Sequence, residues 1–264
     1  MPKVRVRDID MYYEIHGEGE PVVIINGAGA TVELSYRRIP VFAPEFTLIL
    51  FDNRGAGQTD RPDGPYTTDQ MADDLAGLLD VIGIDSAHVQ GNSMGGMIAQ
   101  NFALRYPDRV RSMVLACTYC GGPHSLLPPP SEWQFLASSP EAGAEAILRL
   151  SVTQEHIDQN PEAFRQLVGV FVAHPMDQEV LDKHTAAVRV HDSYDHLHEI
   201  RVPALVMAGE ADRVIPVENA RLLASRIPHA ELVTFPNTGH LLVEMAGKPD
   251  KLALEFFRRH QTGT

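Results

Sequence analysis

A serine stands between two glycines in the segment Gly91-Asn92-Ser93-Met94-Gly95. Ala87–Gln90, directly before it, has the pattern of a short buried strand, and an apolar helical pattern follows it. A sharp turn from a strand into a helix lifts a serine hydroxyl clear of the sheet, and flanking glycines make room for the tight backbone. The sequence therefore predicts that Ser93 is a nucleophile rather than an idle turn residue.

A serine hydroxyl is a poor nucleophile until a base removes its proton, and that base needs an acid to orient it. Two further strand-like segments run into loops that carry such groups. Leu205–Ala208 leads into a loop with Glu210 and Asp212, and Glu231–Phe235 leads into a glycine loop that reaches His240. His240 is therefore the candidate base, and two carboxylates compete as the orienting acid.

Four motifs, in their order along the chain, resemble those of the α/β-hydrolase superfamily, and the resemblance covers essentially the whole chain. Within it, the chain resembles the branch with carboxylesterases, 3-oxoadipate enol-lactonases and cofactor-free haloperoxidases. The joint spacing is specific for the fold but only weakly specific for the substrate. The motifs are Asn26-Gly27-Ala28-Gly29, Asp52-Asn53-Arg54-Gly55-Ala56-Gly57, Gly91-Asn92-Ser93-Met94-Gly95, and Gly209…Asp212 with Gly239-His240.

The resemblance implies a catalytic triad. Ser93 matches the nucleophile of the family, and His240 matches the general base that later acts as an acid. Asp212 is preferred over Glu210 as the orienting acid, because it stands at the position that the family uses after the strand-end glycine. The family also implies an aspartate nucleophile for haloalkane dehalogenases and epoxide hydrolases, so the serine points to acyl transfer instead.

The resemblance further implies an oxyanion hole built from two backbone N–H groups. Met94 follows the nucleophile and supplies one donor, and Ala28 supplies the other from the loop after Val22–Ile25. Relatives usually carry histidine before the glycine of this loop, whereas this chain has Asn26. Two interpretations of Asn26 stay open: it donates and accepts hydrogen bonds in place of the histidine, or it is a turn residue. Asn26 is also a candidate for substrate binding.

The elements that position these residues follow an α/β pattern. Helical patterns alternate with continuous apolar runs, which are typical of parallel strands covered on both faces. Thr67 and Gln70 form a candidate capping box before one helix, which stops near Gly83. We expect a mostly parallel sheet with helices on both faces. Its strand-like segments are Met11–Ile15, Val22–Ile25, Leu48–Phe51, Ala87–Gln90, Met113–Cys117, Leu205–Ala208 and Glu231–Phe235.

The stretch 121–195 breaks this rhythm, because it has proline- and glycine-rich starts and helical patterns but no strand. It matches the helical cap, or lid, of the family, inserted after the sixth strand. Residues 1–120 and 196–264 then form the α/β-hydrolase core. Apolar stripes in the cap favour a substrate with a hydrophobic part. Trp133 and Phe135 are the candidates there for lining the pocket.

Composition restricts the partners. The 35 acidic residues exceed the 22 basic ones, giving a net charge of −13, which disfavours nucleic acid and anionic membranes. No apolar run approaches 18 residues, so a cytoplasmic protein is expected. Cys117 and Cys120 are expected to be buried and inert. Despite His191, His196 and His198, no known ligand spacing predicts a metal, and no motif implies a cofactor. A homodimer through the cap or an edge strand is compatible with the sequence.

The expected activity is hydrolysis of an ester or lactone of a small molecule through an acyl-enzyme on Ser93. A carbon–carbon bond hydrolase of a diketone or ring-cleavage product is the first alternative. It is disfavoured because such enzymes usually carry more glycines in the oxyanion loop than Asn26-Gly27-Ala28-Gly29 has. A cofactor-free haloperoxidase is a further alternative. A non-catalytic small-ligand receptor is the fourth, and the presence of all three triad residues speaks against it.

Overall fold

Eight strands form one sheet in the computed structural model, which describes residues 3–127 and 140–261. Their order across the sheet is β1-β2-β4-β3-β5-β6-β7-β8. The pairs β1–β2 and β2–β4 are antiparallel, and every other pair is parallel. This confirms the mostly parallel sheet. The strands are β1 (Lys3–Val6), β2 (Ile9–His16), β3 (Glu20–Ile25), β4 (Phe46–Phe51), β5 (Ala87–Asn92), β6 (Val110–Ala116), β7 (Ala204–Gly209) and β8 (Ala230–Phe235).

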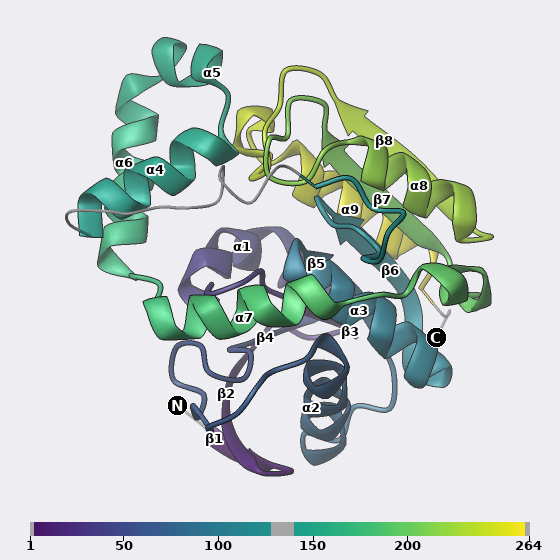
Figure 1. Cartoon of the computed structure of the whole chain (residues 1–264). Helices are drawn as coiled ribbons and strands as arrows, with labels where there is room; N and C mark the ends of the chain where they lie inside the picture. The colour runs from purple at the N-terminus through teal and green to yellow at the C-terminus, as the bar shows by residue number, and fades with distance from the viewer. Residues whose placement is uncertain (1–2, 128–139, 262–264) are drawn as a thin grey trace.

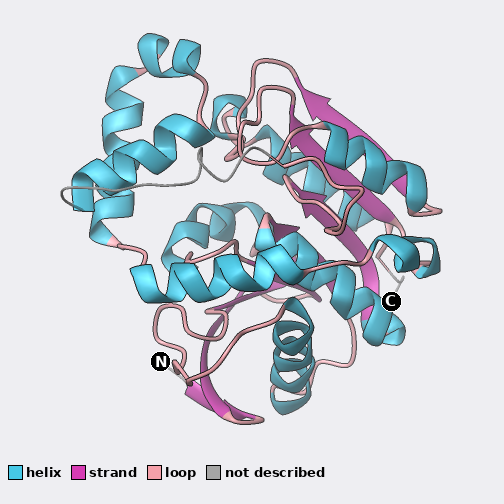
Figure 2. Ribbon diagram, in the orientation of Figure 1, coloured by secondary structure: helices cyan, strands magenta, loops and turns pink. Residues whose placement is uncertain are grey.

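Helices cover both faces of this sheet, as Figure 2 shows. Apolar residues of α2 (Thr68–Val81), α3 (Met94–Arg105) and α8 (Glu218–Arg226) pack on one face. Residues of α1 (Ile39–Phe42) and α9 (Lys248–Arg259) pack on the other. The central strands are buried on both sides, which explains their continuous apolar runs. Short 3₁₀ turns complete the core: η1 (Val32–Arg38), η2 (Pro107–Arg109), η4 (Tyr194–Glu199) and η5 (Val243–Met245).

Local signals set the start of α2. The Thr67 side chain accepts a hydrogen bond from the backbone N–H of Gln70 at 3.0 Å, which is one half of the expected capping box. Helix α2 then buries Met71, Leu75 and Leu78 against the sheet. No helix within the described residues is both long and apolar enough to cross a membrane.

Between β6 and β7, which are neighbours in the sheet, the chain forms four α-helices in its described part. Figure 1 shows α4, α5 and α6 standing to one side of the sheet, while α7 runs back beside α3. Gly121 and Asp192 form an antiparallel bridge, so the two ends of this segment meet. The cap helices after β6 agree with the expected insertion, and the boundaries at 121 and 195 stay predictions. The helices are α4 (Pro140–Ser151), α5 (Gln154–Gln159), α6 (Pro161–Ala173) and α7 (Gln178–Val190).

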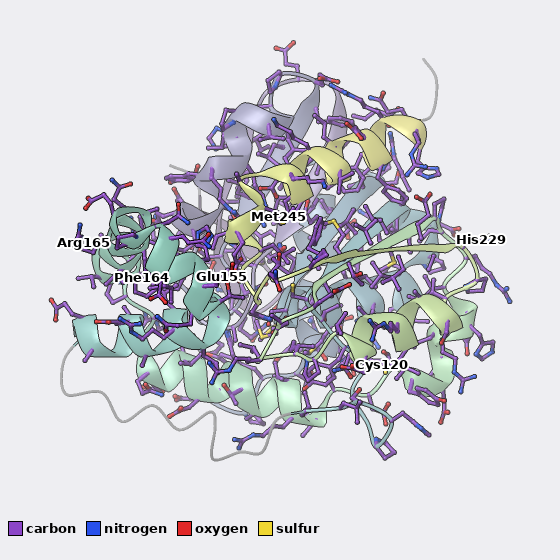
Figure 3. All side chains as sticks on the ribbon, turned by 90° about the horizontal axis from the view of Figure 1, so that it is seen from above. Cys120, Glu155, Phe164, Arg165, His229 and Met245 are labelled. Atoms are coloured by element: carbon purple, nitrogen blue, oxygen red, sulfur yellow. The ribbon has the colours of Figure 1, made fainter. Side chains whose placement is uncertain are left out.

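The cap helices have a small apolar centre of their own. Leu148, Val152, Ile157 and Phe164 are buried together there. Figure 3, seen from above, places Phe164 within this group of helices and His229 at the opposite edge of the molecule. The two candidate cap residues for substrate binding, Trp133 and Phe135, lie outside the described residues.

Candidate active site

Ser93 lies in a strained turn between β5 and α3. Its backbone has φ 54° and ψ −122°, a conformation that is unfavourable for a side chain and concentrates at functional sites. Both flanking glycines are needed by the packing. A Cβ atom at Gly91 would lie 2.2 Å from the Gly95 carbonyl oxygen, and one at Gly95 would lie 2.1 Å from that of Ile25. The turn therefore presses the start of α3 against β3 and presents the serine at the end of β5.

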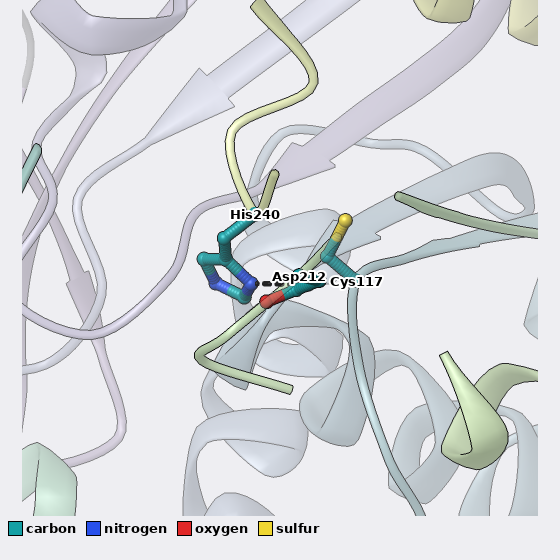
Figure 4. Close-up of side chains that lie close together, drawn as sticks. All are labelled: Cys117, Asp212 and His240. Atoms are coloured by element: carbon teal, nitrogen blue, oxygen red, sulfur yellow. Dashed lines mark hydrogen bonds and ion pairs between the residues drawn. The ribbon is translucent and has the colours of Figure 1, made fainter. Parts of the chain in front are cut away.

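Asp212 and His240 come together from two neighbouring strand ends. His240 Nδ1 lies 2.8 Å from Asp212 Oδ2, as Figure 4 shows. The other carboxylate oxygen of Asp212 accepts hydrogen bonds from the backbone N–H groups of Val214 and Ile215, both at 2.8 Å. A carboxylate held in this way accepts the Nδ1 proton, which leaves His240 Nε2 with a free lone pair. Glu210 is exposed and accepts a hydrogen bond from Thr234 instead.

Ser93 and His240 line the same cavity of about 880 Å³. Among the described residues the serine hydroxyl makes no hydrogen bond to the imidazole. Two of the three expected triad residues are therefore joined directly, and the third shares a cavity with His240. Gly27 lies against Ser93, because a Cβ atom there would be 3.3 Å from Ser93 Cβ. Catalytic hydrogen bonds are often long without substrate and tighten when it binds.

Of the two expected oxyanion donors, Ala28 lines this cavity, and the buried Met94 directly follows the cavity-lining Ser93. Met94 is the first residue of α3, and the first N–H groups of a helix have no acceptor within the helix. Ala28 lines the cavity, and its N–H donates to no acceptor among the described residues. The donors remain predictions, and both are free to act.

Asn26 fastens the oxyanion loop from within. Its Nδ2 donates to the Thr31 carbonyl at 3.1 Å, and its Oδ1 accepts from the Ser35 hydroxyl at 2.6 Å. Its backbone carbonyl accepts from Asn53 at 3.0 Å. The side chain also lines the cavity. These contacts support the first interpretation, in which Asn26 donates and accepts hydrogen bonds that hold the loop, and direct contact with substrate stays a prediction.

A second buried side chain supports the same loop, and no sequence motif marks it. His184 on α7 accepts the Gly29 N–H at Nδ1, 2.9 Å away, and its Nε2 lies 2.8 Å from the Arg54 carbonyl oxygen. This arrangement requires a neutral ring with its proton on Nε2. Burial lowers the pKa of His184, which favours that neutral form. The only sequence signal is a histidine in an amphipathic helix, which does not reveal its partners.

Cys117 and Glu244 complete the surroundings of the acid–histidine pair. The Cys117 thiol lies within 4.8 Å of both the Asp212 carboxylate and the His240 ring. These three side chains could hold a metal ion by geometry, but Asp212 already accepts three hydrogen bonds. Both cysteines are buried and free, as expected. Burial raises the pKa of the Cys117 thiol. Glu244 accepts from the backbone N–H groups of Gly239 and Thr153, each at 3.0 Å, and so ties the histidine loop to the cap.

The cavity has two kinds of wall. The cap contributes apolar side chains from α4 and α6, namely Ile147, Leu150, Leu167, Val170 and Phe171. The core contributes a polar wall from η1, β5 and the start of α9, which includes Arg37, Arg38, Asn92 and Asp250. A ligand that fills this space therefore meets both apolar and charged groups.

Known proteins share this architecture. A family model described as the alpha/beta hydrolase fold matches residues 20–245. The chain is 33% identical to the "Putative carbamate hydrolase RutD" of Azorhizobium caulinodans over 88% of each chain. It is 32% identical to a 2-hydroxy-6-oxononadienedioate/2-hydroxy-6-oxononatrienedioate hydrolase of Burkholderia vietnamiensis, over 96% of this chain and 92% of that protein.

A solved structure extends the likeness to the whole fold. The enol-lactonase from Burkholderia xenovorans LB400 superposes with a TM-score of 0.85 and 26% identity, over 97% of this chain and 100% of that one. The named activities differ in the bond that is cleaved, but all three proteins are named for hydrolysis or lactone opening. The sheet order, the strained serine and the matched family model lead to one conclusion: this chain belongs to the α/β-hydrolase fold family and is a hydrolase.

Proposed function

We propose that the protein is a serine hydrolase that cleaves an ester or lactone of a small, partly hydrophobic molecule through an acyl-enzyme. One observation carries this proposal. The strained Ser93 opens onto the same cavity as a histidine whose Nδ1 is hydrogen-bonded to a buried aspartate. A nucleophile and a base in one cavity, with a buried acid bonded to the base, are the groups that acyl transfer needs.

The proposed reaction has two halves. The Ser93 hydroxyl attacks the substrate carbonyl while His240 Nε2 takes its proton, and the N–H groups of Ala28 and Met94 stabilise the oxyanion. The intermediate collapses when His240 returns the proton to the leaving alkoxide, which leaves an ester on Ser93. Water then loses a proton to His240 and attacks this ester, so that the acid is released and the serine is restored.

The cap walls support a substrate with an apolar portion. Five apolar side chains of α4 and α6 face the cavity, and an apolar lid favours burial of a hydrophobic group away from water. A cytoplasmic location is part of the proposal, because both cysteines are free and buried, as suits a reducing compartment.

The test combines labelling and turnover. We expect a fluorophosphonate to add one equivalent to Ser93, read by intact mass. We also expect hydrolysis of p-nitrophenyl esters, measured over a series from acetate to decanoate. Ser93→Ala should lose the label and at least about 10⁴-fold in kcat. Ser225→Ala, on the exposed face of α8, is the matched control and should change neither.

The results separate the alternatives. Labelling with turnover supports an esterase or lactonase. An unlabelled Ser93 and no turnover would overturn the proposal and favour a small-ligand receptor.

Carbon–carbon bond hydrolysis is the second candidate. It is favoured by a relative that is 32% identical over 96% of this chain and is named as a dienedioate hydrolase. It predicts loss of the long-wavelength absorbance of a dienone ring-cleavage product on incubation with the protein. It also predicts that esters and lactones are left untouched while Ser93 is still labelled. That combination would replace the ester and lactone proposal.

A further inference from the structure

The loop that carries His240 packs against the cap as well as against the core. Its side chains Leu241 and Val243 contact the apolar centre of the cap helices. The Leu241 N–H donates to the Ser151 carbonyl at the end of α4, 3.3 Å away. A Cβ atom at Gly239 would lie 2.4 Å from that same carbonyl oxygen. The backbone on both sides of the expected base therefore presses on the cap.

This loop holds backbone strain. Asn237, Leu242 and Ala246 have φ angles of 49°, 55° and 46°, which lie in the left-handed region that favours glycine. Such strain persists where the surrounding structure holds the backbone in place. His240 lies between two of these residues, so its position depends on the contacts that hold the loop.

One carboxylate oxygen joins the loop to the cap. Glu244 Oε1 accepts hydrogen bonds from the backbone N–H groups of Gly239 and Thr153, each at 3.0 Å. Gly239 directly precedes His240, and Thr153 is the N-cap residue of α5. Neither N–H donates to another acceptor among the described residues. Both N–H groups therefore depend on this one oxygen.

The second oxygen of Glu244 makes this arrangement costly. Oε2 is buried and makes no hydrogen bond with a described residue, whereas buried polar atoms are almost always hydrogen-bonded. An exception of this kind is expected at a functional site. Burial raises the pKa of the Cys117 thiol, and the charges of Asp212 and Glu244 raise it further. The Glu244 carboxylate therefore lies near the group of Cys117, Asp212 and His240.

We propose that Glu244 positions His240 for catalysis by joining the loop of the base to the cap. Proton transfer requires His240 Nε2 within hydrogen-bond reach of the Ser93 hydroxyl, and a displacement of about 1 Å can cost about 10²-fold in rate. Glu244 is a positioning residue, because it bonds the backbone beside His240 rather than a reacting atom. The cap then sets the place of the base in addition to covering the cavity. This inference rests on the proposed function and adds a positioning residue to its site.

Three substitutions of Glu244 separate geometry from charge. Glu244→Ala removes the acceptor, and we expect kcat for p-nitrophenyl butanoate to fall by about 10- to 100-fold. KM should change by less than about threefold, because Glu244 is not among the residues that line the cavity. Glu244→Gln keeps an oxygen that can accept both N–H groups and should return kcat to within about threefold of the parent. Glu244→Asp keeps the charge but withdraws the oxygen by one methylene, and should stay at least about tenfold slow.

A second substitution, at the base itself, shows whether Glu244 acts through it. His240→Ala is expected to retain the slow hydrolysis that substrate binding and the oxyanion donors support. In that background the loss caused by Glu244→Ala should shrink to less than about twofold, because a residue that acts through the base has no effect once the base is absent. The rate of fluorophosphonate labelling of Ser93 should fall in step with kcat in Glu244→Ala. An equal loss in both backgrounds would overturn the inference.

Arg61→Gln is the matched control for a general loosening of the cap. Arg61 forms an exposed ion pair at 2.6 Å with Asp177, the N-cap residue of α7, and does not line the cavity. Its replacement should leave kcat within about twofold of the parent. A loss as large as that of Glu244→Ala would overturn the inference, because any loosening of the cap would then slow the reaction.

The variants are compared at temperatures at which thermal unfolding shows each of them to be folded. If Glu244→Ala does not fold, the difference between Glu244→Asp and Glu244→Gln gives the same test. A kcat within about twofold of the parent in Glu244→Ala would overturn the inference and leave the serine hydrolase standing. If Ser93 of the parent is unlabelled and no ester is hydrolysed, the proposed function itself has failed.

Discussion

At the scale of single residues, the direction in which each side chain points distinguishes Asp212 from Glu210. Both follow β7, and they are two residues apart. The carboxylate of Asp212 is buried and meets His240 at 2.8 Å. Glu210 is exposed and is bound to Thr234 of β8. The geometry therefore favours Asp212 as the orienting acid.

We expect Asp212→Asn to lower kcat for an ester by about 10³- to 10⁴-fold, because an amide can donate to His240 Nδ1 and stabilise the wrong tautomer. KM should change little, since the side chain does not line the cavity wall described here. Steady-state kinetics with a p-nitrophenyl ester measures both constants. Glu210→Gln is the matched control and should stay within about twofold of the parent. The assignment fails if Glu210→Gln is the more damaging change.

The candidate nucleophile, base and acid could be proposed from the sequence because each follows an expected strand in a loop that contains a glycine. Ser93 and His240 can be identified as candidates from their local motifs alone, without knowledge of their neighbours in space. His184 carries no such signal. Its role depends on its contact with Gly29, which is distant in the chain. Tertiary contacts of this kind are absent from local patterns.

At the scale of elements, α7 is more than part of a lid. It carries His184, which bonds the backbone of the oxyanion loop on one side and of the Arg54 loop on the other. Arg54 is itself buried and holds Asp74 of α2 and Asp8 with paired hydrogen bonds. The cap is therefore joined to the loop that contains Ala28 through one neutral imidazole.

We expect His184→Phe to lower kcat for esters by about tenfold with a smaller change in KM, because the Gly29 N–H loses its acceptor and the oxyanion loop becomes less ordered. The rate of fluorophosphonate labelling of Ser93 should fall with kcat. His184→Gln offers one acceptor and should recover part of the rate. A normal kcat in His184→Phe, in a protein that unfolds at the parental temperature, would contradict this role.

Most helices and strands could be predicted from the sequence, and the differences between the expected and observed strands have physical causes. The seven expected strands all occur, with ends shifted by a few residues. β1, Lys3–Val6, was not expected, because four residues with alternating Lys, Val, Arg and Val give too short a pattern. Cys117 was placed inside a strand but lies just beyond β6 with φ 49°. That turn of the backbone brings its thiol beside Asp212 and depends on contacts that periodicity does not describe.

At the scale of the whole molecule, protonation of His191 and of Asp52 changes folding stability in opposite directions as the pH is lowered. Burial lowers the pKa of His191 to about 4, from an ordinary value of 6.5. Between these two values the unfolded chain binds a proton more readily than the folded one. Folding stability therefore decreases as the pH is lowered through this range. Burial raises the pKa of Asp52 to about 6. The folded chain then binds protons more readily between pH 6 and 3.8, and stability rises as pH falls. The two contributions partly cancel in the parent protein.

His191 lies where the cap returns to the core, and its contribution is isolated by comparing variants. Its Nδ1 lies 3.0 Å from the Thr68 hydroxyl of α2, which in turn accepts a hydrogen bond from Asn101 of α3. Either group can donate in the contact between Thr68 and His191, and burial of the ring favours its neutral form. For a shift from 6.5 to about 4, folding stability should fall by about 2 kcal/mol between pH 7.5 and pH 5 through this residue alone.

Replacing His191 removes this pH-dependent contribution to stability. His191→Gln should be less stable than the parent at pH 7.5, because the ring packing is lost, and the gap should close by about 2 kcal/mol at pH 5. Urea unfolding at both pH values measures the gap, and the Asp52 contribution cancels because both proteins contain it. His229→Gln, at the exposed far edge in Figure 3, is the control and should show a constant gap. An unchanged gap for His191→Gln would mean that its imidazole takes up a proton in the folded state, and that the cap junction tolerates the charge.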